Sequence, residues 1–405
     1  MNWEVPLFNL TLDAAEQEAV LAVMKSGWLT QGERVADFER TFAERLGSRF
    51  AIAVSSCTAG LHLVAHALGL GQSDEVILPS LSFVAAANVT VETGATPVFA
   101  DVESFNRPLL DPVDVERKIT DRTRAIIALH YAGHPCDMTA LCEVAQCHNL
   151  HIIEDCAHAP LAEWDGRKVG TFGIAGVFSF FSNKNLATGE GGMIVTDDPA
   201  LAQRLALLRS HGMTHPTLDR HKGHAFGYDV IEAGFNYRMD EMRAAIGLVQ
   251  LNKLESNNER RAQCAARYCE LLADLEWAEV PFLRQKSKGK RQKSKVESQK
   301  SKVKSPKSKV QGQRSVYHIF PIILGDDAPS RDRLMKALRD DRIQTSIHYR
   351  PIHDFTFYRQ RYPTPDARLP ITSALAPGLL TLPLYPTLTA EQQEKVVTSL
   401  ARHKG

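Results

Sequence analysis

Short apolar runs alternate with longer segments of helical spacing in the first half of this chain. The runs lie at residues 76–78, 98–100, 125–128 and 152–153. Such alternation is typical of strands that are joined by helices and lie side by side in one sheet. The pattern therefore predicts an α/β fold, with a mostly parallel sheet and helices on both faces.

The second half of the chain has a different pattern. Residues 238 to about 272 form a long, charged stretch with few helix breakers, which predicts a helix leading out of a large domain. Further elements then predict a small α+β domain. These are a strand near residues 316–323, a helix near 331–339 and a terminal helix near 391–402. We expect a large domain at 1–245 and a small C-terminal domain at 246–405, with segment 1–30 contacting the small domain.

Lys184 and Asp155 suggest a particular chemistry. Lys184 lies in a Gly-rich loop between two expected strands, and Asp155 follows the expected strand His151–Glu154, so it lies at the carboxyl end of a strand. Open α/β sheets bind ligands at that end. A lysine amine can condense with the aldehyde of pyridoxal phosphate, and a carboxylate can keep its ring nitrogen protonated. Taken alone, Lys184 would be a surface lysine in a polar turn, and only its companions favour the catalytic interpretation.

A phosphate site is indicated near residues 55–58. The apolar strand 51–54 runs into Ser55-Ser56-Cys57-Thr58, and apolar residues at helical spacing follow. Hydroxyls and free backbone N–H groups at a helix start can bind an anion. An ordinary Ser/Thr helix cap is the simpler alternative for the same residues.

Several motifs together resemble the DegT/DnrJ/EryC1/StrS family of sugar aminotransferases. The resemblance runs from Gly27 to Pro386 and covers nearly the whole chain. Its motifs are Ser56–His62, Pro79–Asn88 with Thr93–Val98, Glu154–His158, Ser179–Gly192 and Gly234–Glu241. It implies a fold type I pyridoxal phosphate enzyme with a seven-stranded sheet that forms a homodimer.

The resemblance also implies a role for individual residues. Lys184 would bond covalently to the cofactor, Asp155 would pair with the ring nitrogen, and His158 would contact the ring face or its hydroxyl. These three are the expected catalytic residues. Relatives that carry histidine in place of the lysine act as deoxysugar dehydratases, so Lys184 argues against that activity.

The remaining cofactor contacts would come from both subunits. Thr58, Ala59 and Ser179 would hold the phosphate, Phe83 would stack on the ring, and Asn236 would reach the phosphate of the neighbouring subunit. Simpler alternatives stay open for three residues: His158 as a satisfied core histidine, Phe83 as core filling, and Asn236 as the cap of the following helix.

The predicted activity is transfer of an amino group, from glutamate, to a keto-sugar carried on a nucleotide. Candidate sugar contacts are Trp28, Thr30, His348 and Tyr349, although the last two could equally be a strand end. Two alternatives are another pyridoxal phosphate reaction on the same scaffold, such as sugar dehydration or isomerisation, and a non-catalytic regulatory or nucleic-acid-binding protein.

Composition and cysteine spacing add two expectations. No stretch of about 18 apolar residues occurs in the sequence, and the N-terminus has no basic region followed by an apolar run, so we expect a cytoplasmic protein with no membrane span. The seven cysteines form no C-x-x-C pair, which favours reduced thiols. Cysteine and histidine residues between 147 and 158 suggest zinc, but they match no standard ligand spacing, so no metal is expected.

A basic insertion interrupts the second half at residues 284–314. Gln-Lys-Ser-Lys or Pro-Lys-Ser-Lys recurs every seven residues, and only one valine per repeat is apolar. No coiled-coil seam can form, and the segment is expected to be disordered. It carries a net charge of +12, which leaves −11 for the rest of a chain whose total is +1. Nucleic-acid binding is possible for such a charge, but a tolerated surface insertion without aromatic residues is favoured.

Overall fold

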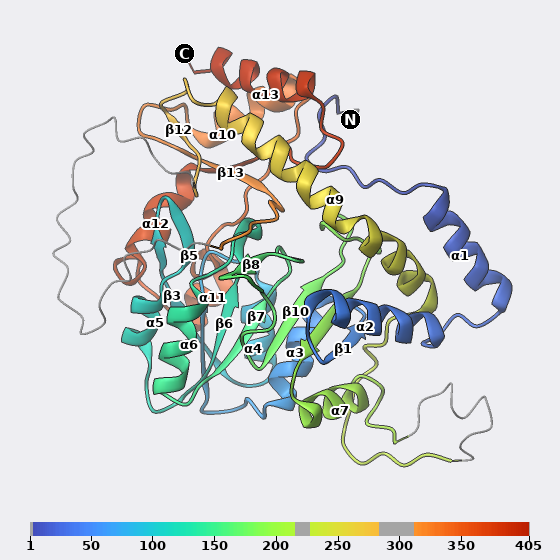
Figure 1. The fold of residues 1–405 in the computed structure, drawn as a ribbon. Helices are drawn as coiled ribbons and strands as arrows, with labels where there is room; N and C mark the ends of the chain where they lie inside the picture. Colours follow the sequence, from blue (N-terminus) through green and yellow to red (C-terminus); the bar gives the residue numbers. More distant parts are fainter. Residues whose placement is uncertain (1–2, 215–226, 283–311, 405) are drawn as a thin grey trace.

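The computed structural model describes residues 3–214, 227–282 and 312–404. A central sheet of seven strands carries helices on both faces, as predicted (Figure 1). Its order is β1 (Phe50–Val54), β11 (Gly192–Thr196), β10 (Ala175–Ser179), β7 (His151–Asp155), β6 (Thr123–Leu129), β2 (Glu75–Pro79) and β3 (Thr96–Ala100). Strand β11 pairs antiparallel with both neighbours, and the other pairs are parallel.

Two apolar layers hold the helices onto the sheet. One layer buries Phe38, Phe42 and Leu141 against one face, and the other buries Leu61 and Leu205 against the opposite face. The helices that contribute to the first layer are α2 (Glu33–Leu46), α5 (Pro112–Lys118), α6 (Met138–Cys147) and α9 (Glu241–Leu271). Those of the second are α3 (Cys57–Ala67), α4 (Ala85–Glu92) and α7 (Pro199–Leu208).

Helix α9 leads from the large sheet to a smaller unit, as Figure 1 shows. Asp240 caps its start, because the carboxylate accepts a hydrogen bond from the backbone N–H of Arg243 at 2.9 Å. Asn236 is therefore not the cap. The smaller unit contains the sheet β12 (Ala278–Glu279), β13 (Phe320–Leu324) and β14 (Leu379–Leu382), with α10 (Arg331–Asp340) and α13 (Ala390–Arg402). Residues of α9, β13, β14, α10 and α13 share one apolar core with Val5.

The N-terminal segment lies on this smaller unit. Val5 forms a bridge with Ile343, and the backbone N–H of Glu4 donates to the carbonyl of Arg342 at 3.0 Å. Both termini consequently lie at the same end of the molecule (Figure 1).

Further short elements complete the described chain. They are α1 (Ala14–Ser26), β4 (Val102–Ser104), β5 (Arg107–Leu110), η1 (Tyr131–Gly133), β8 (Glu163–Trp164), β9 (Arg167–Lys168), η2 (Ile352–Asp354), α11 (Thr356–Arg361), η3 (Asp366–Arg368), α12 (Pro370–Leu375) and η4 (Ala376–Gly378). Among the described residues, no helix combines the length and apolar character needed to cross a membrane.

One predicted element begins later than expected. The strand expected at 316–323 starts only at Phe320. The backbone N–H groups of Val316 and His318 donate instead to the carbonyls of Gly133 and Ala132, at 3.0 and 2.9 Å. This pairing holds His318 beside the large sheet. The predicted basic insertion lies outside the described residues, apart from 312–314.

Candidate active site

Asp155 ends strand β7 in the middle of the large sheet. Its side chain is buried, and its Oδ1 accepts a hydrogen bond from the backbone N–H of Ala157 at 3.1 Å. Burial raises the pKa of this carboxyl, while the positive charge of Lys184 acts to lower it. A buried carboxylate with few donors around it is suited to pair with a cationic ligand.

Lys184 lies on the loop between β10 and β11, and its ammonium is desolvated. The backbone N–H of Lys184 donates to the carbonyl of Phe181 at 2.8 Å, which fixes the turn. Burial lowers the pKa of the amine from 10.5 to about 8, and the charge of Asp155 opposes part of this shift. At neutral pH about one amine in ten is then unprotonated, compared with roughly one in 10³ for an exposed lysine. Lys184 is thus poised as a nucleophile and a proton carrier.

His318 is a site residue that the sequence did not reveal. Its Nε2 lies 3.3 Å from the Lys184 Nζ, and its Nδ1 lies 3.1 Å from the Asn185 Oδ1. The Asn185 amide nitrogen donates to Asn258 and Val316, so its oxygen faces the histidine as an acceptor. The Nδ1 of His318 therefore carries the proton, and its Nε2 presents a lone pair to the lysine amine. Burial also lowers the pKa of His318 well below its usual range, so the ring is neutral.

His158 connects this centre to Tyr349. The backbone N–H of Ala132 donates to the His158 Nδ1 at 3.3 Å, so the Nε2–H donates to the Tyr349 hydroxyl at 2.8 Å. Burial lowers the pKa of His158 well below its usual range, with the charge of Lys184 as a second cause. The ring is hydrogen-bonded on both nitrogens, yet it lies only 4.4 Å from the ring of His318. His158 therefore forms one cluster, the Lys184 cluster, with Lys184, His318 and Tyr349.

Phe83 stands at the open side of the cluster. Its side chain is 58% exposed, so core filling is ruled out, and its ring centroid lies 6.0 Å from that of Tyr349. His348 and Tyr349 follow an isolated bridge between Ser346 and Thr381 of strand β14, and they belong to no strand themselves. His348 bonds through Nδ1 to the hydroxyl of Thr381 at 3.0 Å, and burial lowers its pKa to about 4.

The start of helix α3 offers backbone N–H groups that can bind an anion. It differs from the expectation at Ala59. Ser56 caps the helix, and its Oγ accepts the backbone N–H of Ala59 at 3.1 Å. The Ala59 N–H is thus occupied, which leaves those of Cys57 and Thr58 as the donors at the helix start. A Cβ at Gly192 would lie 2.7 Å from the Cys57 nitrogen, so glycine is needed there for the strand to approach this turn. Ser179 ends the neighbouring strand β10.

The predicted site residues Trp28, Thr30 and Asn236 take part in none of the contacts described above. Trp28 donates through Nε1 to the carbonyl of Gln31 at 3.2 Å, beside the start of helix α2. Thr30 is exposed in the same segment, and Asn236 is exposed in a segment that bridges to Ser210.

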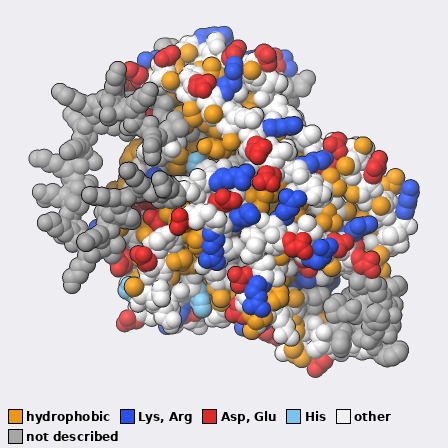
Figure 2. Space-filling model, viewed as in Figure 1, with side chains coloured by type: hydrophobic (Ala, Val, Ile, Leu, Met, Phe, Trp, Pro, Cys, Tyr) orange, Lys and Arg blue, Asp and Glu red, His pale blue; other side chains and the backbone are white. Residues whose placement is uncertain are grey.

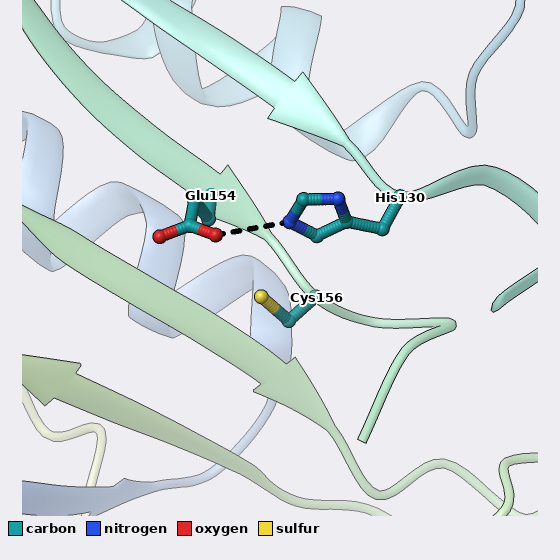
Figure 3. A group of neighbouring side chains, drawn as sticks. All are labelled: His130, Glu154 and Cys156. Carbon is teal, nitrogen blue, oxygen red and sulfur yellow. Dashed lines mark hydrogen bonds and ion pairs between the residues drawn. The ribbon is translucent and has the colours of Figure 1, made fainter. Parts of the chain in front are cut away.

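Glu154 precedes Asp155 and organises the end of strand β7 (Figure 3). It accepts hydrogen bonds from the backbone N–H groups of Gly170, Phe172 and Gly173 at 2.7, 2.7 and 2.8 Å. His130 accepts the Cys136 N–H on Nδ1, so its Nε2–H also donates to Glu154, at 3.1 Å. Cys156 lies beside them, and burial raises its pKa well above the usual range. Four donors occupy the carboxylate and the sulfur stays a thiol, so this group is structural.

Replacing Glu154 with glutamine should destabilise the fold by roughly 2–4 kcal/mol, because the new amide would point a donor at backbone donors and leave them unpaired. Urea unfolding of the two proteins measures the difference. The exposed Glu276→Gln serves as the control and should change stability by less than about 0.5 kcal/mol. An unchanged midpoint for the Glu154 variant would show that these bonds contribute little.

Comparison with known proteins places this site in a family. The model of the DegT/DnrJ/EryC1/StrS aminotransferase family matches residues 10–401. The chain belongs to this family. It is 34% identical over 398 residues to the spore coat polysaccharide biosynthesis protein SpsC of Bacillus subtilis (strain 168), covering 97% of this chain and 95% of that protein.

Solved structures of family members have the same fold. DesV of S. venezuelae, solved in complex with a ketimine intermediate, matches with a TM-score of 0.84 and 34% identity over 100% of this chain and 99% of its own. Helicobacter pylori PseC, an aminotransferase involved in the biosynthesis of pseudoaminic acid, matches with a TM-score of 0.85 and 28% identity over 99% of both chains. The protein is therefore a pyridoxal-phosphate-dependent aminotransferase of fold type I.

The rate at which cofactor-free protein captures pyridoxal phosphate should rise with pH and level off above a midpoint near 8. Only the neutral amine attacks an aldehyde, and burial lowers the pKa of Lys184 from 10.5 to about 8, so its proton is lost at a lower pH than from an exposed lysine. Stopped-flow absorbance after mixing measures this rate. A rate still rising steeply at pH 10 would mean that the amine is not desolvated.

Proposed function

We propose that this aminotransferase moves an amino group from glutamate onto a keto-sugar that is carried on a nucleotide. The observation that supports this most is the desolvated Lys184 amine, with a pKa of about 8, in the electrostatic field of the buried Asp155. Among its relatives, SpsC is named for the biosynthesis of spore coat polysaccharide and PseC for the biosynthesis of pseudoaminic acid. The first of these names fits a sugar acceptor.

The residues present fit pyridoxal phosphate. Asp155 offers a carboxylate for the ring nitrogen, and the donors of Cys57 and Thr58 at the start of α3, together with Ser179, offer a phosphate site. Phe83 presents an exposed ring for stacking, and His158 lies beside the same space. When bound, the cofactor supplies an electron sink for the charge that develops when the donor loses its α-proton.

The chain's own residues supply the proton transfers. The Lys184 amine can take a proton from the donor α-carbon and return it elsewhere, because its pKa lies near the operating pH. His318 faces this amine with a lone pair, so it orients the N–H groups of the lysine without competing for the carboxylate of Asp155. His348 and Tyr349, which join the cluster from the segment before η2, are the proposed sugar contacts, with Trp28 and Thr30 as further candidates.

We also propose a homodimer with a shared site. Asn236 is exposed, and its side chain makes no hydrogen bond within the described residues, which suits a contact to the cofactor phosphate in a neighbouring subunit. Large apolar side chains are exposed close to it in the chain, at Tyr228, Val230 and Ile231. Sedimentation of the pure protein tests this, and a monomer that is fully active would refute it.

Two alternative activities make different predictions. A dehydratase or isomerase would act on the sugar without consuming glutamate. A nucleic-acid-binding protein would need a basic surface, but acidic and basic side chains are interspersed over the described residues of the face in Figure 2. The basic insertion that motivated this alternative lies almost wholly outside the described residues.

The deciding experiment has two stages. Cofactor-loaded protein is first mixed with glutamate, and formation of 2-oxoglutarate is followed with the shift of absorbance to the pyridoxamine form. A panel of nucleotide-linked keto-sugars is then added, and the mass of the product is read. An aminated sugar together with the return of the first spectrum supports the proposal. A sugar product that forms without glutamate contradicts it.

A further inference from the structure

We propose that His353, Asp354 and Asp366 bind a divalent metal ion, with zinc as the best match. His353 and Asp354 belong to η2, and Asp366 begins η3. One ligand atom from each side chain lies within 4.8 Å of the other two. This proposal departs from the expectation of no metal, and nothing in the aminotransferase reaction requires it.

The distances between the three side chains suit shared coordination better than hydrogen bonding. The Nε2 of His353 lies 3.5 Å from the Asp366 Oδ1 and 3.7 Å from the Asp354 Oδ1. Both separations are too long for a hydrogen bond. In a tetrahedral zinc site with bonds of about 2.0–2.2 Å, two ligand atoms lie roughly 3.3–3.5 Å apart. The two distances from His353 to the carboxylates are therefore close to the spacing that such an ion requires.

The Nε2 of His353 is a buried polar atom that faces the two carboxylates without a hydrogen bond. The residue is 3% exposed, and its Nε2 is buried without a hydrogen-bond partner among the described residues. Buried polar atoms are nearly always satisfied, so an atom of this kind needs an explanation. An ion bound between the imidazole and the two carboxylates would provide it.

The opposite nitrogen of the same ring is held as a metal ligand would need. The Nδ1 of His353 lies 2.7 Å from the Ser80 Oγ, which also accepts the His353 backbone N–H at 3.2 Å. A hydroxyl oxygen has two lone pairs and can accept both bonds. When Nδ1 carries the proton and donates to Ser80, Nε2 can offer its lone pair to the ion, which is the usual arrangement of a metal-bound histidine.

Charge and access also favour a cation. Within the described ranges, Asp354 and Asp366 have no ion pair with a lysine or arginine side chain, and Arg350 donates only to the backbone carbonyl of Asp354. The Asp366 side chain is 77% exposed, so an ion can enter from solvent and keep a water as its fourth ligand.

The site joins two segments that carry aromatic residues of the active site. Ser80 precedes Phe83 by three residues, and its carbonyl accepts the backbone N–H of Ile352 at 2.9 Å. Tyr349 lies just before η2 in the other segment. A bound ion would therefore fasten η2 and η3 to the loop that presents Phe83.

Equilibrium dialysis against zinc tests the proposal. The full chain is prepared without an affinity tag, loaded with pyridoxal phosphate and stripped of metal with a chelator. We expect Asp366→Asn to lose one zinc per chain, or to bind it at least about tenfold more weakly. The control is Asp332→Asn on α10, whose side chain is 90% exposed and lies beside Arg331. It should bind zinc as the unmodified chain does. Any zinc held by cysteines is then equal in the variant and the control and does not contribute to the difference between them.

A second measurement, of the melting temperature, distinguishes loss of the zinc site from a folding defect. Zinc should raise the melting temperature of the unmodified chain and of the control, because it binds only the folded form, and should raise that of Asp366→Asn less. His353→Gln, which keeps a group able to bond to Ser80, should behave like the aspartate variant. Equal zinc binding and equal shifts in all four proteins would overturn the proposal and leave a metal-free group in which His353 lies between two carboxylates.

Discussion

Replacing Lys184 with alanine should lower the rate of amino transfer by roughly 10³-fold or more. The substitution removes the amine that bonds to the cofactor and carries the proton, and proton transfer alone contributes about 10²–10⁴-fold in enzymes. Burial lowers the pKa of this amine to about 8, so a larger fraction of it is neutral at pH 7 than of an exposed lysine. Single-turnover absorbance with glutamate measures the loss directly.

Two further measurements test whether the lower rate of amino transfer comes from the missing amine. Adding a small primary amine such as methylamine should restore part of the rate, since it supplies the missing proton carrier. The control Lys25→Ala, at the exposed end of helix α1, should react at the normal rate. If Lys184→Ala transfers the amino group within a few fold of the unmodified chain, the assignment of the catalytic lysine is wrong.

The sheet and the positions of Asp155 and Lys184 could be predicted because the residues that indicate them are neighbours in the sequence. Asp155 follows an apolar run, and a residue after a buried strand must lie at the carboxyl edge of the sheet. The Gly-rich loop around Lys184 separates two such runs. Each assignment needs only the chain on either side of the residue.

His318 could not be predicted in this way, because its role depends on contacts between distant segments. In the sequence it lies inside an apolar stretch that suggests a strand. In the structure, backbone hydrogen bonds to Ala132 and Gly133 hold this stretch beside Lys184. The Asn185 oxygen then determines which nitrogen of the His318 ring carries the proton. The occupied backbone N–H of Ala59 could not be predicted either, since only the structure shows that the Ser56 hydroxyl accepts it.

Replacing Asp155 with asparagine should reduce amino transfer by about 10²-fold or more while the fold is kept. The amide oxygen can still accept the backbone N–H of Ala157, now made at 3.1 Å, so the turn after β7 stays in place. The buried negative charge is lost, however, and with it the partner that keeps the cofactor's ring nitrogen protonated. Removing one preorganised electrostatic contact in an active site typically costs about 10²–10³-fold.

The same variant makes a second prediction, about Lys184. The charge of Asp155 raises the pKa of the Lys184 amine and so opposes its burial. Without that charge the pKa should fall below about 8, and the pH midpoint for capture of pyridoxal phosphate should move down with it. The control is Asp165→Asn, an exposed turn residue with a φ of 49° that asparagine tolerates, and it should change neither the rate nor the midpoint. A slow Asp155→Asn enzyme with an unmoved midpoint would mean that the carboxylate does not act on this lysine.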